Sequence, residues 1–157
     1  MHVVVAAFGS YGDVFPFIGI ARELRNRGHE VVFCTNEHFR REAEAENLSF
    51  GAIGDAASYD ATIRDPDIWH PTRGAQIVLR NVASRIAEVY DGLLAHYRDG
   101  ETVLVASTLA LGARLIRETH GGRLVSVHLA PNVFRSRDDP IILPHVTVPA
   151  GLPGVVK

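Results

Sequence analysis

The sequence is poor in cysteine, in long apolar runs and in excess charge of either sign. Its one cysteine, Cys34, excludes an internal disulfide and a thiolate metal cluster, which fits a reducing compartment. The apolar run near Met1 follows no Lys or Arg and is too short for a membrane span or a signal peptide. A net charge of -2 provides no basic field that would attract nucleic acid. We therefore expect a cytoplasmic protein with no nucleic-acid partner.

The histidines do not supply a metal site either. None of the eight forms an H-x-x-x-H pair, and none has a cysteine at ligand spacing. The sequence therefore predicts no bound metal. What it does contain is an ordinary globular composition, with 46% hydrophobic and 22% charged residues in 157 positions. A chain of this size and composition is expected to bury a real core in one domain.

Short apolar runs alternate with stretches of helical periodicity. Strands are expected at residues 3–8, 30–35, 48–53, 102–106 and 123–129, and helices from Pro16 to about residue 27 and over 37–47, 74–98 and 109–120. Residues 54–71 lose this periodicity and predict a long irregular loop. The alternation predicts an α/β fold: a Rossmann-like, doubly wound parallel sheet in a single domain, with strand order 3-2-1-4-5. We expect the domain to span 1–135 and a proline-rich tail to span 136–157.

The turn from Gly9 to Pro16 joins the first strand to the first helix. A glycine-rich loop in this position is typical of a phosphate site at a helix amino terminus. The spacing here is G-x-x-G, not G-x-G-x-x-G, and Cys34-Thr35-Asn36 place no acidic residue at the end of the second strand. A nucleotide-binding oxidoreductase, which would bind NAD or NADP, therefore remains an alternative.

The same turn carries a family resemblance. The segment Gly-Ser-Tyr-Gly-Asp-Val-Phe-Pro at 9–16, with Arg-Gly-His-Glu-Val at 27–31 and Val-His-Leu-Ala-Pro at 127–131, resembles GT-B glycosyltransferases. It is most similar to the bacterial antibiotic and sterol branch of the UDP-glycosyltransferase superfamily. The resemblance implies a Rossmann-like amino-terminal half that binds the acceptor and a second half that binds the nucleotide-sugar donor. Because no motif of that second half occurs before Lys157, we expect an amino-terminal fragment that is inactive alone.

The resemblance also implies a catalytic role for Asp13. Inverting transfer to a hydroxyl requires a base behind the acceptor oxygen, and a carboxylate can serve. In many relatives the loop reads G-H-x-x-P with histidine as the base, and Asp13 occupies the aligned position. A purely structural role, as a cap or a favourable charge at the helix amino terminus, is the alternative.

Further candidates are expected around the same crevice. Acceptor-binding roles are predicted for Ser10, Gly12, His128, Asn132 and Phe134. The alternatives are a simple tight turn for Ser10 and Gly12, a structural histidine for His128, and loop packing for Asn132 and Phe134. Trp69 and His70 in the irregular segment are further candidates to cover an apolar acceptor.

The sequence thus predicts the acceptor-binding domain of an inverting hexosyltransferase that acts on a natural-product, glycopeptide or sterol-like hydroxyl. No cofactor is expected, and the nucleoside diphosphate sugar is a co-substrate bound mainly by the second domain. A stand-alone binding module without catalysis remains the alternative. Self-association through the face meant for a second domain and peripheral contact with a membrane are also open at this point.

Overall fold

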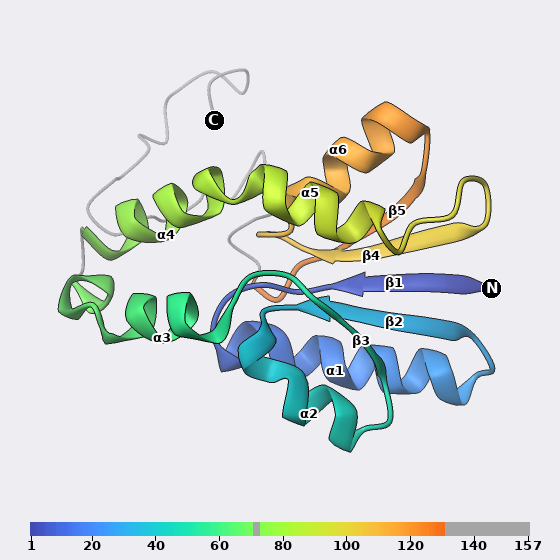
Figure 1. Ribbon diagram of the computed structural model, residues 1–157, viewed down its shortest axis with the longest axis horizontal. Coiled ribbons are helices and arrows are strands. Elements are labelled where there is room, and N and C mark those ends of the chain that lie inside the picture. The colour runs from blue at the N-terminus through green and yellow to red at the C-terminus, as the bar shows by residue number, and fades with distance from the viewer. Residues whose placement is uncertain (71–72, 131–157) are drawn as a thin grey trace, which may run out of the picture.

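The computed structural model describes residues 1–70 and 73–130 as one sheet flanked by helices (Figure 1). The strands are β1 (His2–Ala6), β2 (Glu30–Thr35), β3 (Ser49–Ala52), β4 (Thr102–Ser107) and β5 (Arg123–Val127). The helices are α1 (Tyr11–Asn26), α2 (Arg40–Ala45), α3 (Ala56–Arg64), α4 (Arg73–Ser84), α5 (Ile86–Leu94) and α6 (Leu111–His120), with short 3-10 turns η1 (Glu37–Phe39) and η2 (Pro66–Trp69).

All strand pairs in the sheet are parallel, in the order β3-β2-β1-β4-β5. This confirms the predicted α/β class and strand order. The central strand β1 is paired on both sides, so that Val4 lies opposite Val32 of β2 and Leu104 of β4. A strand in this position is covered by helices on both faces, which explains why its sequence is an unbroken apolar run.

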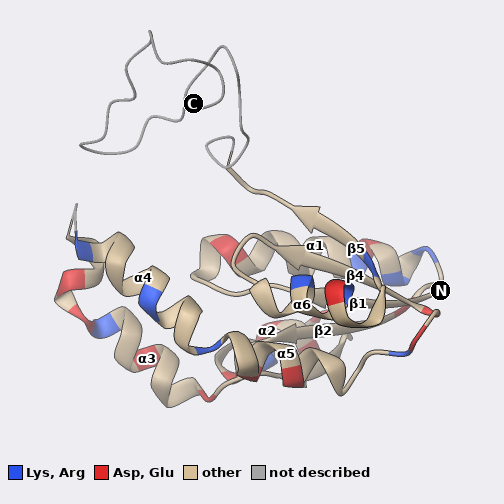
Figure 2. Cartoon of the chain, turned by 90° about the horizontal axis from the view of Figure 1, so that it is seen from above, with Lys and Arg blue, Asp and Glu red and all other residues tan. Residues whose placement is uncertain are grey.

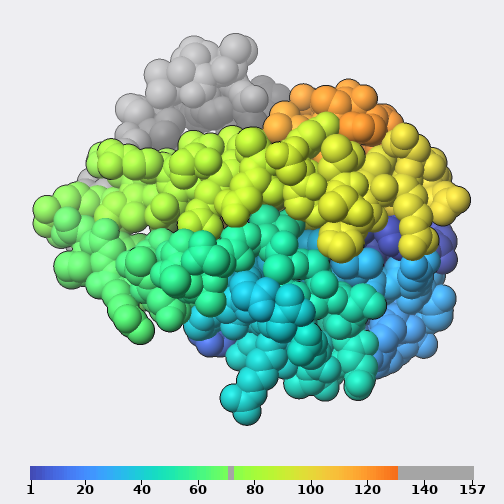
Figure 3. All heavy atoms as spheres, in the orientation of Figure 1, coloured from blue at the N-terminus to red at the C-terminus, as the bar shows by residue number. Residues whose placement is uncertain are grey.

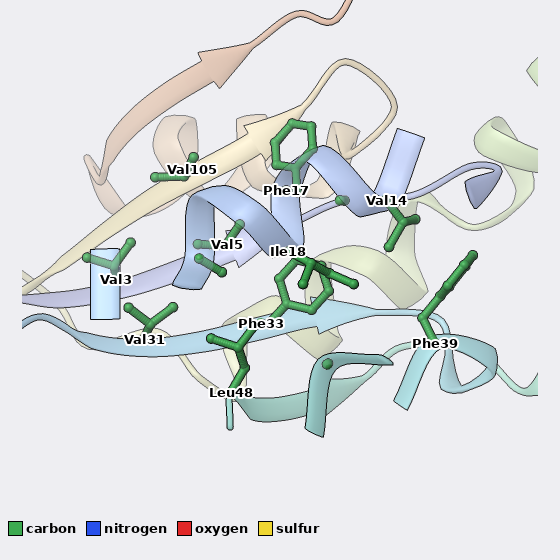
Figure 4. Packing of buried hydrophobic residues seen from close by; sticks show 13 residues of the cluster. Val3, Val5, Val14, Phe17, Ile18, Val31, Phe33, Phe39, Leu48 and Val105 are labelled. Carbon is green, nitrogen blue, oxygen red and sulfur yellow. The ribbon is translucent and has the colours of Figure 1, made fainter. Parts of the chain in front are cut away.

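Alternate residues of β1 enter two separate cores. Val3 and Val5 face α1, where Phe17 is fully buried, together with residues of β2 and α2. Figure 4 shows the labelled side chains of α1 lying among those of β1, β2 and β4. Val4 and Ala6 face the other layer, made by α5 and α6. The period of two along a strand therefore divides one apolar run between two helical layers.

The first helix begins earlier than expected. The prediction placed Pro16 in its first turn, but α1 starts at Tyr11 and Pro16 lies inside it. The expectation was wrong because Ser10, not Pro16, marks the helix start. Proline cannot supply the N–H that the carbonyl of Gly12 would accept. Gly12 is exposed, so water can reach that carbonyl.

The expectation of an irregular loop over 54–71 was wrong for residues 54–70, which the structure describes. Helix α3 and turn η2 occupy most of this segment. Asp55 starts α3 by accepting the Ser58 N–H at 2.7 Å, and Asp65 starts η2 by accepting the Asp67 N–H at 2.9 Å. No side chain of α3 or η2 is buried, so the segment lacks the apolar stripe from which helices are recognised.

Two other expected helices are shorter or divided. The predicted helix 74–98 is two helices, α4 and α5, separated at Arg85, whose φ of -107° and ψ of 4° leave the helical range. The predicted helix 37–47 is η1 followed by α2. Apolar spacings of three and four run through both breaks, so periodicity alone could not locate them.

The α3–η2–α4 segment forms an arm beyond the carboxyl ends of the strands (Figures 1 and 3). Charged residues of both signs are spread along this arm, whereas the strands carry few (Figure 2). The arm therefore lies beside the turn that follows β1, at the carboxyl ends of the strands.

Candidate functional site

The β1–α1 turn fixes the carboxylate of Asp13 at the carboxyl end of the central strand β1. Ser10 precedes α1, and its C=O accepts the N–H groups of Asp13 and Val14, each at 3.0 Å. In return, the Ser10 N–H donates to Asp13 Oδ2 at 2.7 Å and the Ser10 hydroxyl donates to the same oxygen at 2.9 Å. A side chain at the third helical position that reaches back to the cap residue is half of a capping box. These two hydrogen bonds restrain the rotamer of the Asp13 side chain.

The carboxylate of Asp13 lies against the backbone of Gly9. A Cβ on Gly9 would come within 2.4 Å of Asp13 Oδ2, and the φ of Gly9 is 129°. Both the close approach and the backbone angle therefore require glycine. The negatively charged carboxylate of Asp13 thus lies at the amino terminus of α1, a position at which other glycine-rich turns bind phosphate.

A cavity of about 350 Å³ opens beside this turn, and Ser10 and Asp13 belong to its wall. Its other walls come from the ends of β2 and β3, from the arm, from α5 and from the segment after β4. The lining is largely apolar and includes Phe8, Ile53, Ile63, Ile68, Trp69, Val78, Val82, Val89 and Leu109. Cavities with this mixture of apolar surface and a few polar groups are the usual form of small-molecule sites.

Aromatic contacts hold α3 beside the turn. His38 stacks on Tyr59 of α3 with ring centroids 4.3 Å apart, and its Nε2 lies 2.9 Å from the hydroxyl of Tyr11. The Nδ1 of His38 lies 3.2 Å from a carboxylate oxygen of Asp60. Burial raises the pKa of Tyr59, and the charges of Tyr11, Asp13 and Asp60 raise it further. Tyr59 is thus a neutral phenol in the wall of the cavity that Asp13 also lines.

The arm is packed closely enough to shape the cavity. A Cβ on Gly74, at the start of α4, would come within 2.2 Å of the carbonyl oxygen of Ile68 in η2. This contact sets η2 directly against α4 and positions Ile68 and Trp69 on the cavity wall. Trp69 is nevertheless 77% exposed, so a large part of its ring is accessible to a ligand or to solvent.

The residues predicted from sequence are only partly brought together. Ser10, Asp13 and Trp69 line the cavity, whereas Gly12 is an exposed residue of the first turn of α1 outside the lining. His128 follows β5, also outside the lining, with its Nδ1 2.9 Å from the hydroxyl oxygen of Thr108.

Two of the predicted acceptor-binding residues, Asn132 and Phe134, lie outside the described residues, as does the predicted tail 136–157. His70 accepts the Arg73 N–H at its Nδ1 at 3.3 Å and is not part of the cavity wall.

Several lining residues were not predicted from sequence. Polar examples are Asn36, Tyr59, Arg85 and Glu88. For Tyr59, a signal was present, because Asp55 followed by alanines and Ser58 is a helix start. For Arg85 and Glu88 no local signal existed, since they face the cavity only because α4 and α5 divide at that point.

Neither a cluster of metal-ligating side chains nor a membrane-spanning helix occurs in the described part of the chain. Residues 1–70 and 73–130 contain no group of three or more His, Cys, Asp or Glu side chains placed to hold a metal ion. No helix in the same residues has the length and apolar character needed to cross a membrane.

The sequence of residues 3–124 matches the glycosyltransferase family 28 N-terminal domain. The chain belongs to this family. The matched range runs from Val3 in β1 to Leu124 in β5 and includes all the residues that line the cavity.

The family 28 domain is similar to parts of several longer proteins. It is 39% identical over 67 residues to O-mycaminosyltylonolide 6-deoxyallosyltransferase of Streptomyces fradiae, which covers 43% of this chain and 14% of that protein. It is 35% identical over 54 residues to a sterol 3-beta-glucosyltransferase of Arabidopsis thaliana, and the match covers 34% of this chain and 8% of that protein. An uncharacterised glycosyltransferase of Mycobacterium tuberculosis is 25% identical over 138 residues, covering 83% and 33%. The chain spans a third or less of these relatives.

Solved structures share the fold of the family 28 domain. The glycosyltransferase SsfS6 of a Streptomyces species, in complex with thymidine diphosphate, superposes with a TM-score of 0.64 at 19% identity, covering 82% of this chain and 38% of that one. SnogD of Streptomyces nogalater superposes with a TM-score of 0.62 at 21% identity, covering 83% and 35%. At this identity the likeness establishes the Rossmann-like fold and no more.

Proposed function

We propose that this domain binds the acceptor in an inverting glycosyltransferase, with Asp13 as the general base. The observation that carries the proposal is the position of the Asp13 carboxylate on the wall of a largely apolar cavity. Both hydrogen bonds that the structure describes for this carboxylate end on Oδ2 and come from Ser10. They orient the group and leave Oδ1 for an acceptor hydroxyl.

The proposed chemistry follows from that arrangement. The acceptor hydroxyl donates to Oδ1 of Asp13 and transfers its proton there as its oxygen attacks the anomeric carbon of the sugar. A new bond forms between that carbon and the acceptor oxygen while the bond to the nucleoside diphosphate breaks. The diphosphate leaves with the electron pair from the opposite face, so the anomeric configuration inverts.

The cavity supports a small acceptor with an apolar body. Its volume of about 350 Å³ and apolar walls suit a fused-ring or macrocyclic surface better than a free sugar. Two relatives are named for a tylonolide and for a sterol acceptor, and both names describe molecules with large apolar surfaces. We therefore assign the acceptor to the natural-product or sterol class.

The donor is proposed to bind mainly through a second domain that lies beyond this chain. A structural neighbour is named as a complex with thymidine diphosphate, which supports a nucleoside diphosphate sugar as co-substrate. The β1–α1 turn is unsuited to the diphosphate itself, because the Asp13 carboxylate lies against Gly9 and would repel it. The same repulsion disfavours the alternative of a dinucleotide oxidoreductase.

The proposal is tested with Asp13→Asn in the full-length enzyme. The amide keeps the size of the side chain but cannot accept the proton, so kcat is expected to fall by about 10²- to 10⁴-fold while KM for the acceptor changes little. Asp99→Asn is the matched control, because Asp99 is exposed in the turn before β4. Equal turnover for Asp13→Asn and Asp99→Asn would refute the role of Asp13.

A further inference from the structure

The arginine at the junction of α4 and α5 has an unusual position. Arg85 N–H donates to the Val82 carbonyl at 3.2 Å, and its own carbonyl accepts the Val89 N–H at 2.9 Å. These two bonds fix the residue between the helices, where its φ and ψ leave the helical range. The side chain therefore starts from a defined point on the cavity wall rather than from a mobile loop.

The guanidinium of Arg85 is weakly paired. Its one salt bridge within the described residues is with Glu88, at 3.9 Å between Nη1 and Oε2, and the Arg85 side chain is 33% exposed. A hydrogen bond from the Ser58 backbone lowers the pKa of Asp55, and the nearby charge of Arg85 lowers it further. By contrast, Arg98 binds both carboxylate oxygens of Glu30 at 2.7 and 2.9 Å. A guanidinium carries five N–H donors, and none of those of Arg85 makes a hydrogen bond within residues 1–70 and 73–130.

Space for this guanidinium is made by the glycine after β3. A Cβ on Gly54 would come within 2.9 Å of Arg85 Nη1 and 3.0 Å of Asn36 Nδ2. Gly54 also has a φ of 80°, which a side chain would strain. Asn36 is already engaged, because its Nδ2 donates to the Asp55 carbonyl at 3.1 Å and its Oδ1 accepts the His38 N–H at 2.9 Å. The unused donors at this end of the cavity are therefore the second N–H of Asn36 Nδ2 and the N–H groups of the Arg85 guanidinium.

The charges of the cavity are uneven. Among the described residues that line it, Asp13 and Glu88 are acidic and Arg85 is the only basic one. Low-polarity walls strengthen a charge-assisted hydrogen bond and increase the cost of leaving a charge unpaired. A planar guanidinium in such surroundings is suited to a carboxylate or another anionic oxygen.

We propose that Arg85 selects acceptors that carry an anionic oxygen, a carboxylate or a phenolate, on their apolar body. The apolar part fills the cavity, the hydroxyl that receives the sugar lies at Asp13, and the anionic oxygen replaces the long contact between Arg85 and Glu88. This inference rests on the proposed function and narrows its acceptor to the natural-product class, since a sterol carries no anionic oxygen. Arg85 determines specificity and takes no part in proton transfer.

A pair of fluorescent dyes tests this inference on the 157-residue chain. The probes are 8-anilinonaphthalene-1-sulfonate and N-phenyl-1-naphthylamine, which share the same aromatic body and differ by the sulfonate. Arg85→Gln is expected to weaken binding of the sulfonated dye by about 10- to 100-fold, because a hydrogen bond to a charged group is lost. Binding of the neutral dye should change by less than about twofold. Competition between the two dyes on the parent chain verifies that they share one site.

Arg80→Gln is the matched control, because Arg80 lies exposed on α4 outside this cavity and its substitution changes the net charge equally. The inference is overturned if Arg85→Gln weakens the binding of both dyes equally or does not weaken that of the sulfonated dye. It is also overturned if Arg80→Gln weakens binding of the sulfonated dye to a similar extent, or if the parent chain binds neither dye. If Arg85→Gln fails to fold, Arg85→Lys decides, with a selective loss for the sulfonated dye supporting the inference and an unselective result overturning it. Dye affinity is measured without turnover, so this result and that of Asp13→Asn can fail independently.

Discussion

At the scale of single residues, the structural and catalytic roles of Asp13 are compatible. Sequence alone left them as alternatives, one as a helix cap and one as a base. The structure shows the capping contacts, from the N–H and hydroxyl of Ser10, and both meet Oδ2. A carboxylate has two oxygens with several acceptor positions, so a capped Asp13 keeps an oxygen for a ligand. The cap restrains the orientation that a base requires.

The pH dependence of stability is expected to depend on His2. This residue is buried at the start of β1, with its Nδ1 2.9 Å from the hydroxyl oxygen of Thr102. Burial lowers the pKa of His2 below its ordinary 6.5, and the nearby positive charge of Arg98 lowers it further. At a pH between the pKa of His2 in the folded protein and its pKa of about 6.5 in the unfolded chain, the unfolded chain binds more protons. The free energy of unfolding therefore falls as the pH drops below about 6.5, and it levels off below the pKa of His2 in the folded protein.

The measurement is urea unfolding of the parent chain and His2→Asn at several pH values between 8 and 5. His2→Asn is expected to be less stable at pH 8 but to lose less stability on acidification, because asparagine does not titrate in this range. Identical slopes for the two proteins below pH 6.5 would show that His2 is not the titrating group.

At the scale of elements, the strands and helix α6 were predictable, whereas α3 and the division between α4 and α5 were not. Strands β1, β2 and β4 are apolar runs that are largely buried, and this pattern is local, whereas β3 and β5 are more exposed. Helix α3 buries no side chain, and the break at Arg85 interrupts a regular apolar spacing. Such features depend on contacts with distant segments, so the sequence pattern carries little information about them.

Two glycines test how closely the helices pack. Gly112 lies at the contact of α6 with α5, where a Cβ would come within 2.5 Å of the Tyr90 backbone nitrogen. Gly112→Ala is therefore expected to destabilise the fold by about 1–3 kcal/mol, since backbone atoms must shift. Gly19 lies inside α1 with nothing within 4 Å of a Cβ, so Gly19→Ala should stabilise by about 0.5–1 kcal/mol.

Chemical denaturation of both variants, with the parent chain as reference, measures this difference. Gly19→Ala serves as the matched control because both sites are helical glycines. Similar effects of the two substitutions would mean that α5 and α6 do not approach as closely as the structure shows.

At the scale of the whole molecule, the candidate site joins segments that are distant in sequence. The turn after β1 was recognised because its glycines and Asp13 follow a strand. The opposite wall could not be predicted, because it requires the arm of α3, η2 and α4 to fold back beside that turn. The contacts of His38 with Tyr59 and Asp60 join the arm to the sheet, and no local pattern pairs these residues.

The chain spans a third or less of its relatives, and we propose that the complete reaction requires a longer protein. We propose two tasks for this domain, to hold an apolar acceptor in the cavity and to remove the proton of the acceptor hydroxyl through Asp13. The donor and its leaving group are assigned to the remainder of the enzyme. Proton removal is the central claim, because the fold alone would also suit a binding module without chemistry.

Chemical rescue of Asp13→Ala in the full-length enzyme tests that claim most directly. Removal of the carboxylate is expected to lower the rate of sugar transfer by about 10²- to 10⁴-fold. Added formate, a small carboxylate that can occupy the vacated space, should restore part of the rate in a saturable manner. The control Asp99→Ala should transfer sugar at the parent rate, with or without formate. Transfer by Asp13→Ala at the parent rate, or a lowered rate that formate does not raise in a folded enzyme, would contradict the account.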